Sequence, residues 1–179
     1  MRGLVVGRFQ PFHRGHLELI RALRRGSPHE RLLVVIGSAE QAYTWANPFT
    51  AGERYEMAER ALTEARVPDV AIVPVVDIAR HALWVRYLEG LLPRFDWVYS
   101  HNPLTVLLFQ RAGYPTKSPP LIARERFEGV QIRERLARGQ DVRALVPPSV
   151  ARYLGEIDAV ERLAALRPRE RPHRPRARR

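Results

Sequence analysis

Short apolar runs rich in β-branched residues alternate along the chain with segments of helical periodicity. Such runs are typical of strands buried on both faces, and they predict strands at Gly3–Gly7, Leu32–Gly37, Val70–Val76 and Asp96–Ser100, with a shorter fifth around Pro120–Ala123. The other segments predict helices at Gly15–Arg25, Ala51–Ala65, Leu83–Leu92 and Pro103–Arg111, then two more near Val130–Arg138 and Ser149–Leu166. This alternation indicates a parallel sheet covered on both faces. The expected fold class is therefore α/β: a Rossmann-like three-layer sandwich with a mostly parallel, about five-stranded sheet and extra C-terminal helices.

The positive charge of the chain is concentrated at its end. The formal net charge is +11 over 179 residues, and the segment Arg167–Arg179, with seven arginines and one glutamate, carries +6 of it. Three prolines oppose a helix there, and the segment has almost nothing apolar to bury. We therefore expect one folded domain over residues 1–166 and a disordered Arg/Pro-rich tail over 167–179. The remaining +5 suits anionic small molecules, and a nucleic-acid partner is not expected.

The composition is that of an ordinary soluble protein, with 45% hydrophobic and 27% charged residues. No apolar run approaches the length of a membrane span, and the first residues lack the basic-then-apolar pattern of a signal peptide. We expect a cytoplasmic location without membrane association. The absence of cysteine excludes disulfides and thiolate metal sites.

The segment "GRFQPFHRGH", Gly7–His16, directly follows the first predicted strand. Ligands in parallel sheets bind at the carboxyl ends of strands, and a helix N-terminus favours bound phosphate. His13 and His16 flank the predicted N-terminus, and imidazole donates a hydrogen bond when neutral and carries charge when protonated. The segment has neither a P-loop nor a GxGxxG pattern. It is either a different type of nucleotide site or a polar loop with two helix-capping histidines.

Within that segment, "HRGH" resembles the HxGH signature of the nucleotidyltransferase superfamily. All ten residues are similar to the archaeal-type nicotinamide mononucleotide adenylyltransferases in particular. The similarity continues to about Leu166. It includes "GSA" (37–39), "NPFTAGER" (47–54), "DIARHALWV" (77–85) and "SHNPLT" (100–105).

The resemblance implies two sets of binding residues. As catalytic residues it implies Arg8, His13, His16 and Arg133. For ATP binding it implies Gly7, Arg8, Phe9, His13, Gly15, His16, Gly129, Ile132 and Arg133. For the nicotinamide nucleotide it implies Gln10, Gly37, Ser38, Asn47, Arg54, Asp77, Trp84 and Asn102, and no residue is expected to bind a metal.

Some of these residues also have a purely structural interpretation. By resemblance, Trp84 would stack on the pyridine ring, but an aromatic residue on an amphipathic helix can equally belong to the core. Thr50 and Glu53, in the second motif, have the spacing of a helix capping box, which is compatible with the family role.

The third family signature is incomplete in this chain. The family has a Ser-Gly-Thr-Glu-Ile/Val-Arg-like stretch at the start of a late helix, and here the sequence is "EGVQIR", Glu128–Arg133. Glu128 and Val130 replace the two hydroxyl residues, and a carboxylate beside a triphosphate is unfavourable unless it turns away or holds a cation. The family also often has a basic residue where this chain has Ala46.

The implied reaction joins ATP to nicotinamide mononucleotide and yields NAD and pyrophosphate. The mononucleotide phosphate is the nucleophile, and with a second pKa of about 6 it needs no general base. Catalysis is then positioning and charge neutralisation. Mg²⁺ is expected with ATP, and no tightly bound organic cofactor is expected. The resemblance also implies a homo-oligomer, often a hexamer in the family.

Three other functions fit parts of the sequence. The chain could transfer a nucleotidyl group to another phosphate, such as that of FMN or phosphopantetheine. It could be a non-catalytic nucleotide sensor whose third motif has decayed. It could bind nucleic acid through its arginine-rich tail, but no nucleic-acid motif supports this.

Overall fold

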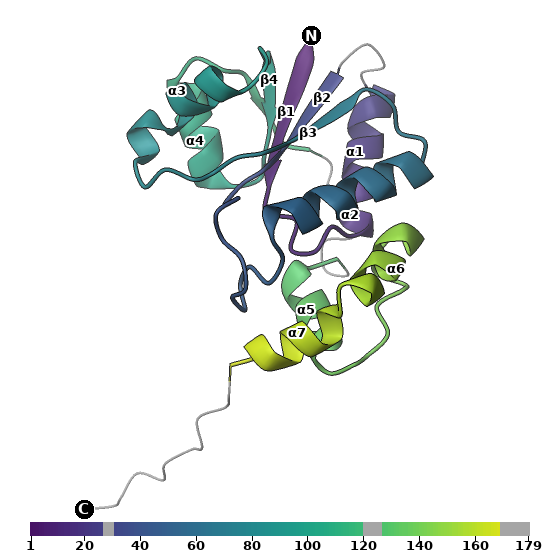
Figure 1. Ribbon diagram of the computed structural model, residues 1–179. Coiled ribbons are helices and arrows are strands. Elements are labelled where there is room, and N and C mark those ends of the chain that lie inside the picture. The colour runs from purple at the N-terminus through teal and green to yellow at the C-terminus, as the bar shows by residue number, and fades with distance from the viewer. Residues whose placement is uncertain (27–30, 120–126, 169–179) are drawn as a thin grey trace, which may run out of the picture.

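The computed structural model describes residues 1–26, 31–119 and 127–168. These residues form a parallel sheet with the strand order β3-β2-β1-β4-β5 (Figure 1). The strands are β1 (Arg2–Gly7), β2 (Arg31–Ile36), β3 (Val70–Pro74), β4 (Trp97–Tyr99) and β5 (Thr116–Lys117). Every pairing between them is parallel. The predicted α/β class is confirmed.

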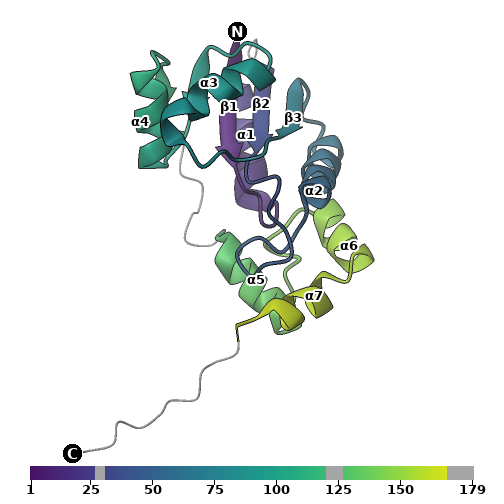
Figure 2. The ribbon, with the colours of Figure 1, turned by 60° about the vertical axis from the view of Figure 1, so that its left-hand side comes forward.

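Helices cover both faces of the sheet. α1 (Arg14–Gly26) and α2 (Ala51–Glu64) lie on one face, and α3 (His81–Leu91) and α4 (Pro103–Arg111) lie on the other (Figures 1 and 2). α5 (Gly129–Ala137), α6 (Pro148–Glu156) and α7 (Ala159–Leu166) form a group beyond the lower end of the sheet in Figure 1. None of the described helices is long and apolar enough to cross a membrane.

After an arginine at their first position, the central strands β1 and β2 are apolar because both of their faces are buried. Val5 and Val34 point into the core shared with α1 and α2, whereas Leu4 and Leu33 point into the core shared with α3 and α4. Successive side chains of a strand point to opposite faces, so a strand between two helical layers carries few polar residues. This explains why the sequence showed continuous apolar runs.

The strand order reverses at β1, which pairs with β2 on one side and β4 on the other. The chain therefore leaves β1 toward one face of the sheet and reaches β4 by way of the other. At such a switch point the loops that follow neighbouring strands separate and leave a crevice at their carboxyl ends. The β1–α1 loop with its two histidines lies at this edge.

The last predicted helix is wrong in one respect: Ser149–Leu166 is two helices. Asp158 has left-handed backbone (φ 50°), which ends α6 and starts α7 in a new direction. α6 packs against α2, and α7 packs against α5. A single straight helix could not make both contacts. No glycine or proline lies at positions 156–158, so no strong local signal predicts the break.

Two other predictions concern regions that are partly outside the described residues. The fifth strand expected around Pro120–Ala123 falls in the undescribed stretch 120–126, and the structure has a two-residue strand, Thr116–Lys117, before it. Of the predicted tail, residues 169–179 lie outside the description. Arg167, at its start, forms a 3.5 Å ion pair with Glu134 of α5.

Candidate active site

The β1–α1 loop packs closely around two glycines. Phe9 has left-handed backbone (φ 52°), and its ring lies against Gly7, where an added Cβ would be 2.8 Å from a ring carbon. At Gly15 an added Cβ would lie 2.9 Å from the Cβ of Phe127. Any larger residue at either position would displace its neighbour. α1 begins at Arg14, directly after this loop.

His13 and His16 form a stacked pair at the first turn of α1. Their ring centroids are 3.5 Å apart, with an interplanar angle of 16°. The backbone N–H of each residue donates to Nδ1 of the other ring, at 3.3 Å in both cases. Because Nδ1 is the acceptor in both rings, the proton of each neutral ring is on Nε2. The pair therefore has two Nε2–H donors that these contacts leave unused.

Aromatic rings surround the pair. Phe9 and Phe12 lie 4.7 Å and 5.5 Å from the His16 ring, and Phe127 stacks 6.3 Å from His13. Burial lowers the pKa of His13 to about 4. Burial, and then the charge of His13, lower the pKa of His16 well below its usual range. Both rings are neutral hydrogen-bond donors at physiological pH when no anion is bound.

Arg54 is fully buried and bonds only to backbone carbonyls among the contacts in the described residues. Its guanidinium donates to the carbonyls of Gly37 (2.8 Å), Ser38 (2.9 Å), Arg8 (3.1 Å) and Thr50 (3.2 Å). A buried cation is stable only when its N–H groups are satisfied in this way. Arg54 thus connects the loops that follow β1 and β2. The predicted contact of this residue with the nicotinamide nucleotide remains a prediction.

Arg133 approaches the same loop from α5. It donates through one guanidinium nitrogen to the carbonyl of Gln10 at 2.8 Å, and its buried Nε has no hydrogen-bond partner among the described residues. An added Cβ at Gly129 would be 3.0 Å from that carbonyl, so the glycine lets α5 come close. Burial lowers the pKa of both Arg133 and Arg54. The positive charge of Arg8 lowers both pKa values further. Three guanidinium groups therefore lie near one loop.

The side chain of Gln10 joins this loop to the segment before α2. It donates to the carbonyl of Phe49 and accepts from its N–H, both at 3.0 Å, and is itself buried. Asn47, two residues earlier, donates to the side chain of Gln41 at 2.7 Å. The Asn47 Oδ1 is buried and has no partner among the described residues.

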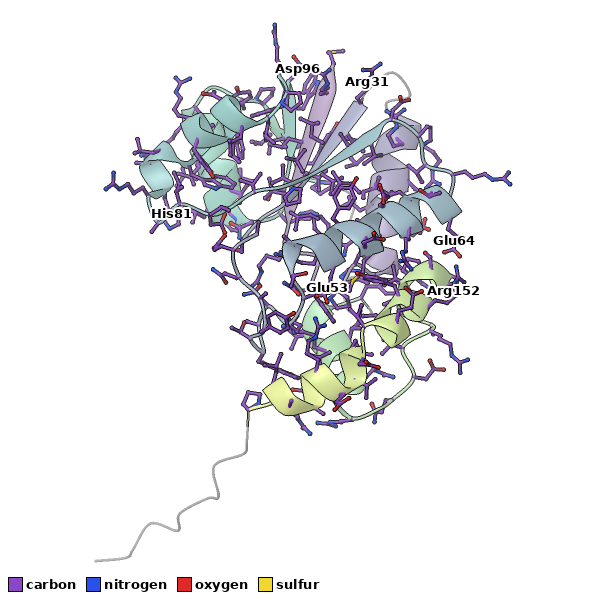
Figure 3. All side chains as sticks on the ribbon, viewed as in Figure 1. Arg31, Glu53, Glu64, His81, Asp96 and Arg152 are labelled. Atoms are coloured by element: carbon purple, nitrogen blue, oxygen red, sulfur yellow. The ribbon has the colours of Figure 1, made fainter. Side chains whose placement is uncertain are left out.

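A pocket of about 380 Å³ lies between the β2–α2 loop, the β3–α3 loop and helices α3 and α4, at the carboxyl ends of the strands. Its walls include three of the predicted nicotinamide-site residues, Asp77, Trp84 and Asn102. The other lining residues are Glu40, Gln41, Ile78, Ala79, His81, Leu104, Thr105 and Leu108. His81 lies at the start of α3 (Figure 3). Residues from the β3–α3 loop, from α3 and from the start of α4 thus meet in one pocket, and their contact with the nicotinamide nucleotide remains a prediction.

One wall of the pocket is acidic, which the sequence did not reveal. Ser38 donates to the Asp77 carboxylate at 2.6 Å, and the Glu40 carboxylate accepts the N–H of Asp77 at 3.0 Å and the amide of Gln41 at 3.2 Å. Glu40 and Gln41 were not predicted as site residues. Their position directly after "GSA", at the carboxyl end of β2, was the available signal.

Two of the predicted ligand contacts also have structural partners. Asn102 caps α4 by accepting the N–H of Thr105 at 3.0 Å. Trp84 is half-buried and packs edge-on against Phe109, with centroids 5.6 Å apart. Asn102 is therefore fixed by its own helix, and Trp84 is fixed by a residue of the neighbouring helix α4, while both line the pocket. The capping box of Thr50 and Glu53 is confirmed, with bonds of 3.1 Å and 2.8 Å.

The altered third signature starts α5. Glu128 is the N-terminal capping residue but makes no capping bond; its exposed carboxylate accepts from Gln131 at 3.2 Å. Val130 is 54% exposed. Ile132 is fully buried in the core, so its side chain is a packing residue. Gly129 and Arg133 keep the positions expected of them beside the histidine loop.

The fold and the histidine pair define the class of the molecule: an α/β nucleotidyltransferase-like protein with its site at the switch point of a parallel sheet. The profile of the cytidylyltransferase-like family matches residues 4–135. A nicotinamide-nucleotide adenylyltransferase from Methanolobus tindarius is 42% identical over 97% of this chain and 98% of its own length. A protein of the same name from Halobacterium salinarum is 43% identical over 90% of this chain and 90% of its own length. Another, from Thermoplasma acidophilum, is 39% identical over 92% of this chain and 91% of its own length. The chain belongs to the cytidylyltransferase-like family and, within it, to the archaeal-type nicotinamide-nucleotide adenylyltransferases.

A solved structure shares the fold. The bifunctional NMN adenylyltransferase/ADP ribose pyrophosphatase from Francisella tularensis, complexed with AMP and a manganese ion, superposes with a TM-score of 0.73 at 20% identity. The match covers 92% of this chain but only 51% of the Francisella protein, so the chain spans about half the length of that bifunctional protein.

Proposed function

We propose that this protein transfers the adenylyl group of ATP to nicotinamide mononucleotide, forming NAD and pyrophosphate. The observation that carries this proposal is the stacked His13–His16 pair, whose two Nε2–H donors lie at the start of α1, at the same edge of the sheet as a pocket lined by Trp84. The names of the archaeal relatives support the same reaction. A phosphate oxygen of the mononucleotide bonds to the α-phosphorus of ATP, and the bond from that phosphorus to the β-phosphate bridge breaks.

The histidines act on charge that develops during this step. The neutral Nε2–H groups donate to α-phosphoryl oxygens, and their hydrogen bonds strengthen as negative charge accumulates in the pentacoordinate state. Water exclusion by the neighbouring aromatic rings strengthens these bonds further. His16 makes the larger contribution in the transition state, and His13 positions the triphosphate.

The arginines hold the polyanion. Arg8 is exposed at the loop and binds the phosphates directly, together with the free guanidinium N–H groups of Arg133. Arg54 contributes its positive charge from behind the loops. Among the described residues, no three His, Cys, Asp or Glu side chains are grouped so that they could hold a metal ion. Mg²⁺ would enter with ATP as part of the substrate.

The nicotinamide nucleotide occupies the pocket of about 380 Å³. Trp84 contacts the cationic pyridinium ring, and the carboxylates of Asp77 and Glu40 favour its positive charge. Gly37, Ser38 and Asn102 lie at the carboxyl ends of β2 and β4, where the ribose would lie. Asn47, with an unpaired Oδ1, offers an acceptor if the loop shifts on binding.

The test is incubation of the purified protein with ATP, Mg²⁺ and nicotinamide mononucleotide, followed by assay for NAD and pyrophosphate. A parallel panel replaces the mononucleotide with FMN or phosphopantetheine, and product from either would favour a different acceptor. ATP binding without any product would favour a nucleotide sensor. We further propose a cytoplasmic location and a homo-oligomer, which size-exclusion chromatography with light scattering would measure.

A further inference from the structure

Arg162, on α7, contacts the loop between β2 and α2 in several ways. One guanidinium nitrogen lies 2.7 Å from the Glu53 carboxylate and 3.4 Å from the carbonyl of Pro48. The guanidinium also lies 5.1 Å from the centre of the Tyr43 ring. The ion pair is largely buried, with 18% of the Arg162 side chain and 14% of the Glu53 side chain exposed. Figure 3 shows Glu53 where α2 meets the C-terminal helices.

The Glu53 carboxylate accepts two hydrogen bonds, one from Arg162 and one from the N–H of Thr50. Burial alone would raise its pKa, but the hydrogen bonds from Arg162 and from the N–H of Thr50 lower it. Glu53 therefore stays ionised between a helix cap and a cation from a distant part of the chain. A largely buried ion pair of this kind fixes geometry better than an exposed ion pair does.

The loop held by Arg162 reaches the nucleotide pocket. Pro48 is adjacent to Asn47, whose side-chain amide donates to Gln41 at 2.7 Å, and Gln41 is a pocket wall residue. Thr44 and Asn47 close the turn between them, with bonds of 3.0 Å and 3.2 Å. A continuous series of contacts thus runs from α7 to the pocket.

We infer that Arg162 is a positioning residue for the nicotinamide-nucleotide half of the site. It holds the β2–α2 loop so that Gln41 and its neighbour Glu40 face the pocket. Arg133 does the corresponding work for the histidine loop through the carbonyl of Gln10. The C-terminal helices would then set both halves of the site, each through one arginine. This inference rests on the proposed function for the identity of the ligand.

Arg60 provides a matched control. Like Arg162, it forms an ion pair to another helix, 2.8 Å from Glu156 of α6, and it lies over an aromatic ring, 4.4 Å from the centre of Tyr153. It contacts no residue of the β2–α2 loop among its interactions in the described part of the chain. Replacing Arg60 removes the same types of interaction without touching the pocket.

The experiment compares Arg162→Ala, Arg162→Lys and Arg60→Ala in steady-state assays. We expect Arg162→Ala to raise the KM for nicotinamide mononucleotide about three- to tenfold, as follows if the fraction of molecules with a correctly placed loop falls to about a third or a tenth. The KM for ATP and kcat should stay within about twofold, Arg162→Lys should recover part of the loss, and Arg60→Ala should change neither KM. Glu53→Gln keeps the helix cap, and combined with Arg162→Ala it should cost no more than Arg162→Ala alone.

Equal rises in both KM values, or a fall in melting temperature alone that Arg60→Ala reproduces, would overturn the inference. Calorimetric titration of wild type and Arg162→Ala with nicotinamide mononucleotide tests the positioning role of Arg162 independently of the proposed reaction. If wild type makes no NAD yet binds the mononucleotide several-fold more tightly than Arg162→Ala, the reaction fails and the positioning role stands. If neither protein binds it, the identity of the ligand fails, and the inference about this pocket fails with it.

Discussion

The histidine pair and the Trp84 pocket lie at the same edge of the sheet, but they are held in different ways. The histidine loop is buried and fixed from several sides: Arg54 from α2, Arg133 from α5, and Gln10 through Phe49. The pocket is lined by two loops and by the exposed first turns of α3 and α4, and the bonds that fix its loops are Ser38–Asp77 and those around Asn47. The first region is held rigidly, as the proposed function requires of groups that stabilise a transition state, whereas the second has room to adjust to a ligand.

This difference has a consequence for mutagenesis. In a rigid, water-excluded region, the loss of one donor acts mainly on the chemical step. In a more open pocket, the loss of one side chain acts mainly on binding of the ligand it faces. Variants in the two regions should therefore separate into those that lower kcat and those that raise one KM.

The largest effect is expected for His16→Ala. It removes an Nε2–H donor that strengthens as charge develops, so kcat should fall about a hundred- to a thousandfold while ATP binding remains measurable. His81→Ala, in the other region, should leave kcat within a few-fold of wild type. Single-turnover assays with an ATP-binding titration measure both. A nearly normal rate for His16→Ala would return the histidines to a helix-capping role.

The next prediction concerns the burial of the histidine pair and its effect on stability. In the unfolded chain a histidine binds a proton near pH 6.5, but in the folded protein the pKa of His13 is about 4. The unfolded state therefore holds more protons between these values, and the free energy of unfolding falls as the pH is lowered from about 6.5 to about 4. His13→Asn should remove up to about 1.4 kcal/mol per pH unit from that slope.

Urea unfolding of the nucleotide-free protein at several pH values between 4 and 7 measures this slope. Carboxylates that have lowered pKa values, such as Glu53, contribute a slope of the same sign in both proteins, so the difference between variant and wild type is the informative quantity. His81→Asn, at an exposed position, is the control and should follow wild type. An unchanged slope in His13→Asn would mean that the pair is more hydrated in solution than its burial indicates.

The sequence predicted the histidine half of the site far better than the pocket. Gly7, His13, Gly15 and His16 lie within ten residues, and local packing dictates their types, so one segment was sufficient. Arg54 was predicted to bind the mononucleotide, but three of its four carbonyl partners lie on loops 16 to 46 residues away. No local pattern shows that the guanidinium of Arg54 donates its hydrogen bonds to carbonyls that come together only in the folded chain.

The same argument applies to the fold. The first four strands and the first five helices were predicted within a few residues, because burial on both faces and helical periodicity are local signals. The break at Asp158 was missed because a left-handed residue other than glycine is selected there by two separate packing partners, α2 and α5. Arg162 was missed for a related reason, since its role depends on a contact between residues more than a hundred positions apart.

Trp84→Ala should have a smaller effect, confined to one substrate. Loss of an aromatic contact of about 0.5–1.5 kcal/mol predicts a several-fold to roughly tenfold rise in the KM for nicotinamide mononucleotide, with the KM for ATP nearly unchanged. Because Trp84 also packs on Phe109, some loss of melting temperature is expected. Trp84→Phe keeps an aromatic ring, so its KM for nicotinamide mononucleotide should lie between those of wild type and Trp84→Ala. If both KM values rise equally, Trp84 is a core residue and the pocket is not where the pyridine ring binds.

The smallest effect is expected at the altered third signature, at the start of α5, which contacts the histidine loop through Arg133. The exposed Glu128 carboxylate is already bonded to Gln131, so its repulsion of ATP is screened, and Val130 offers no hydroxyl. Glu128→Ser with Val130→Thr should lower the KM for ATP only about two- to threefold, of the order of 0.5 kcal/mol. The new serine should also cap α5, which now has no capping bond, and stabilise the fold by up to about 1 kcal/mol.

Titration of ATP against both proteins at fixed Mg²⁺, with thermal melts alongside, separates the two contributions. Raised stability without a change in KM would show that the first turn of α5 does not reach the phosphates, leaving Arg133 as the contribution of that helix. A higher KM in the double variant would mean that Glu128 assists ATP, for example by orienting the cation that accompanies it. If wild type makes no NAD and the double variant does, the natural protein is a nucleotide-binding relative whose histidine half is intact and whose phosphate site is not.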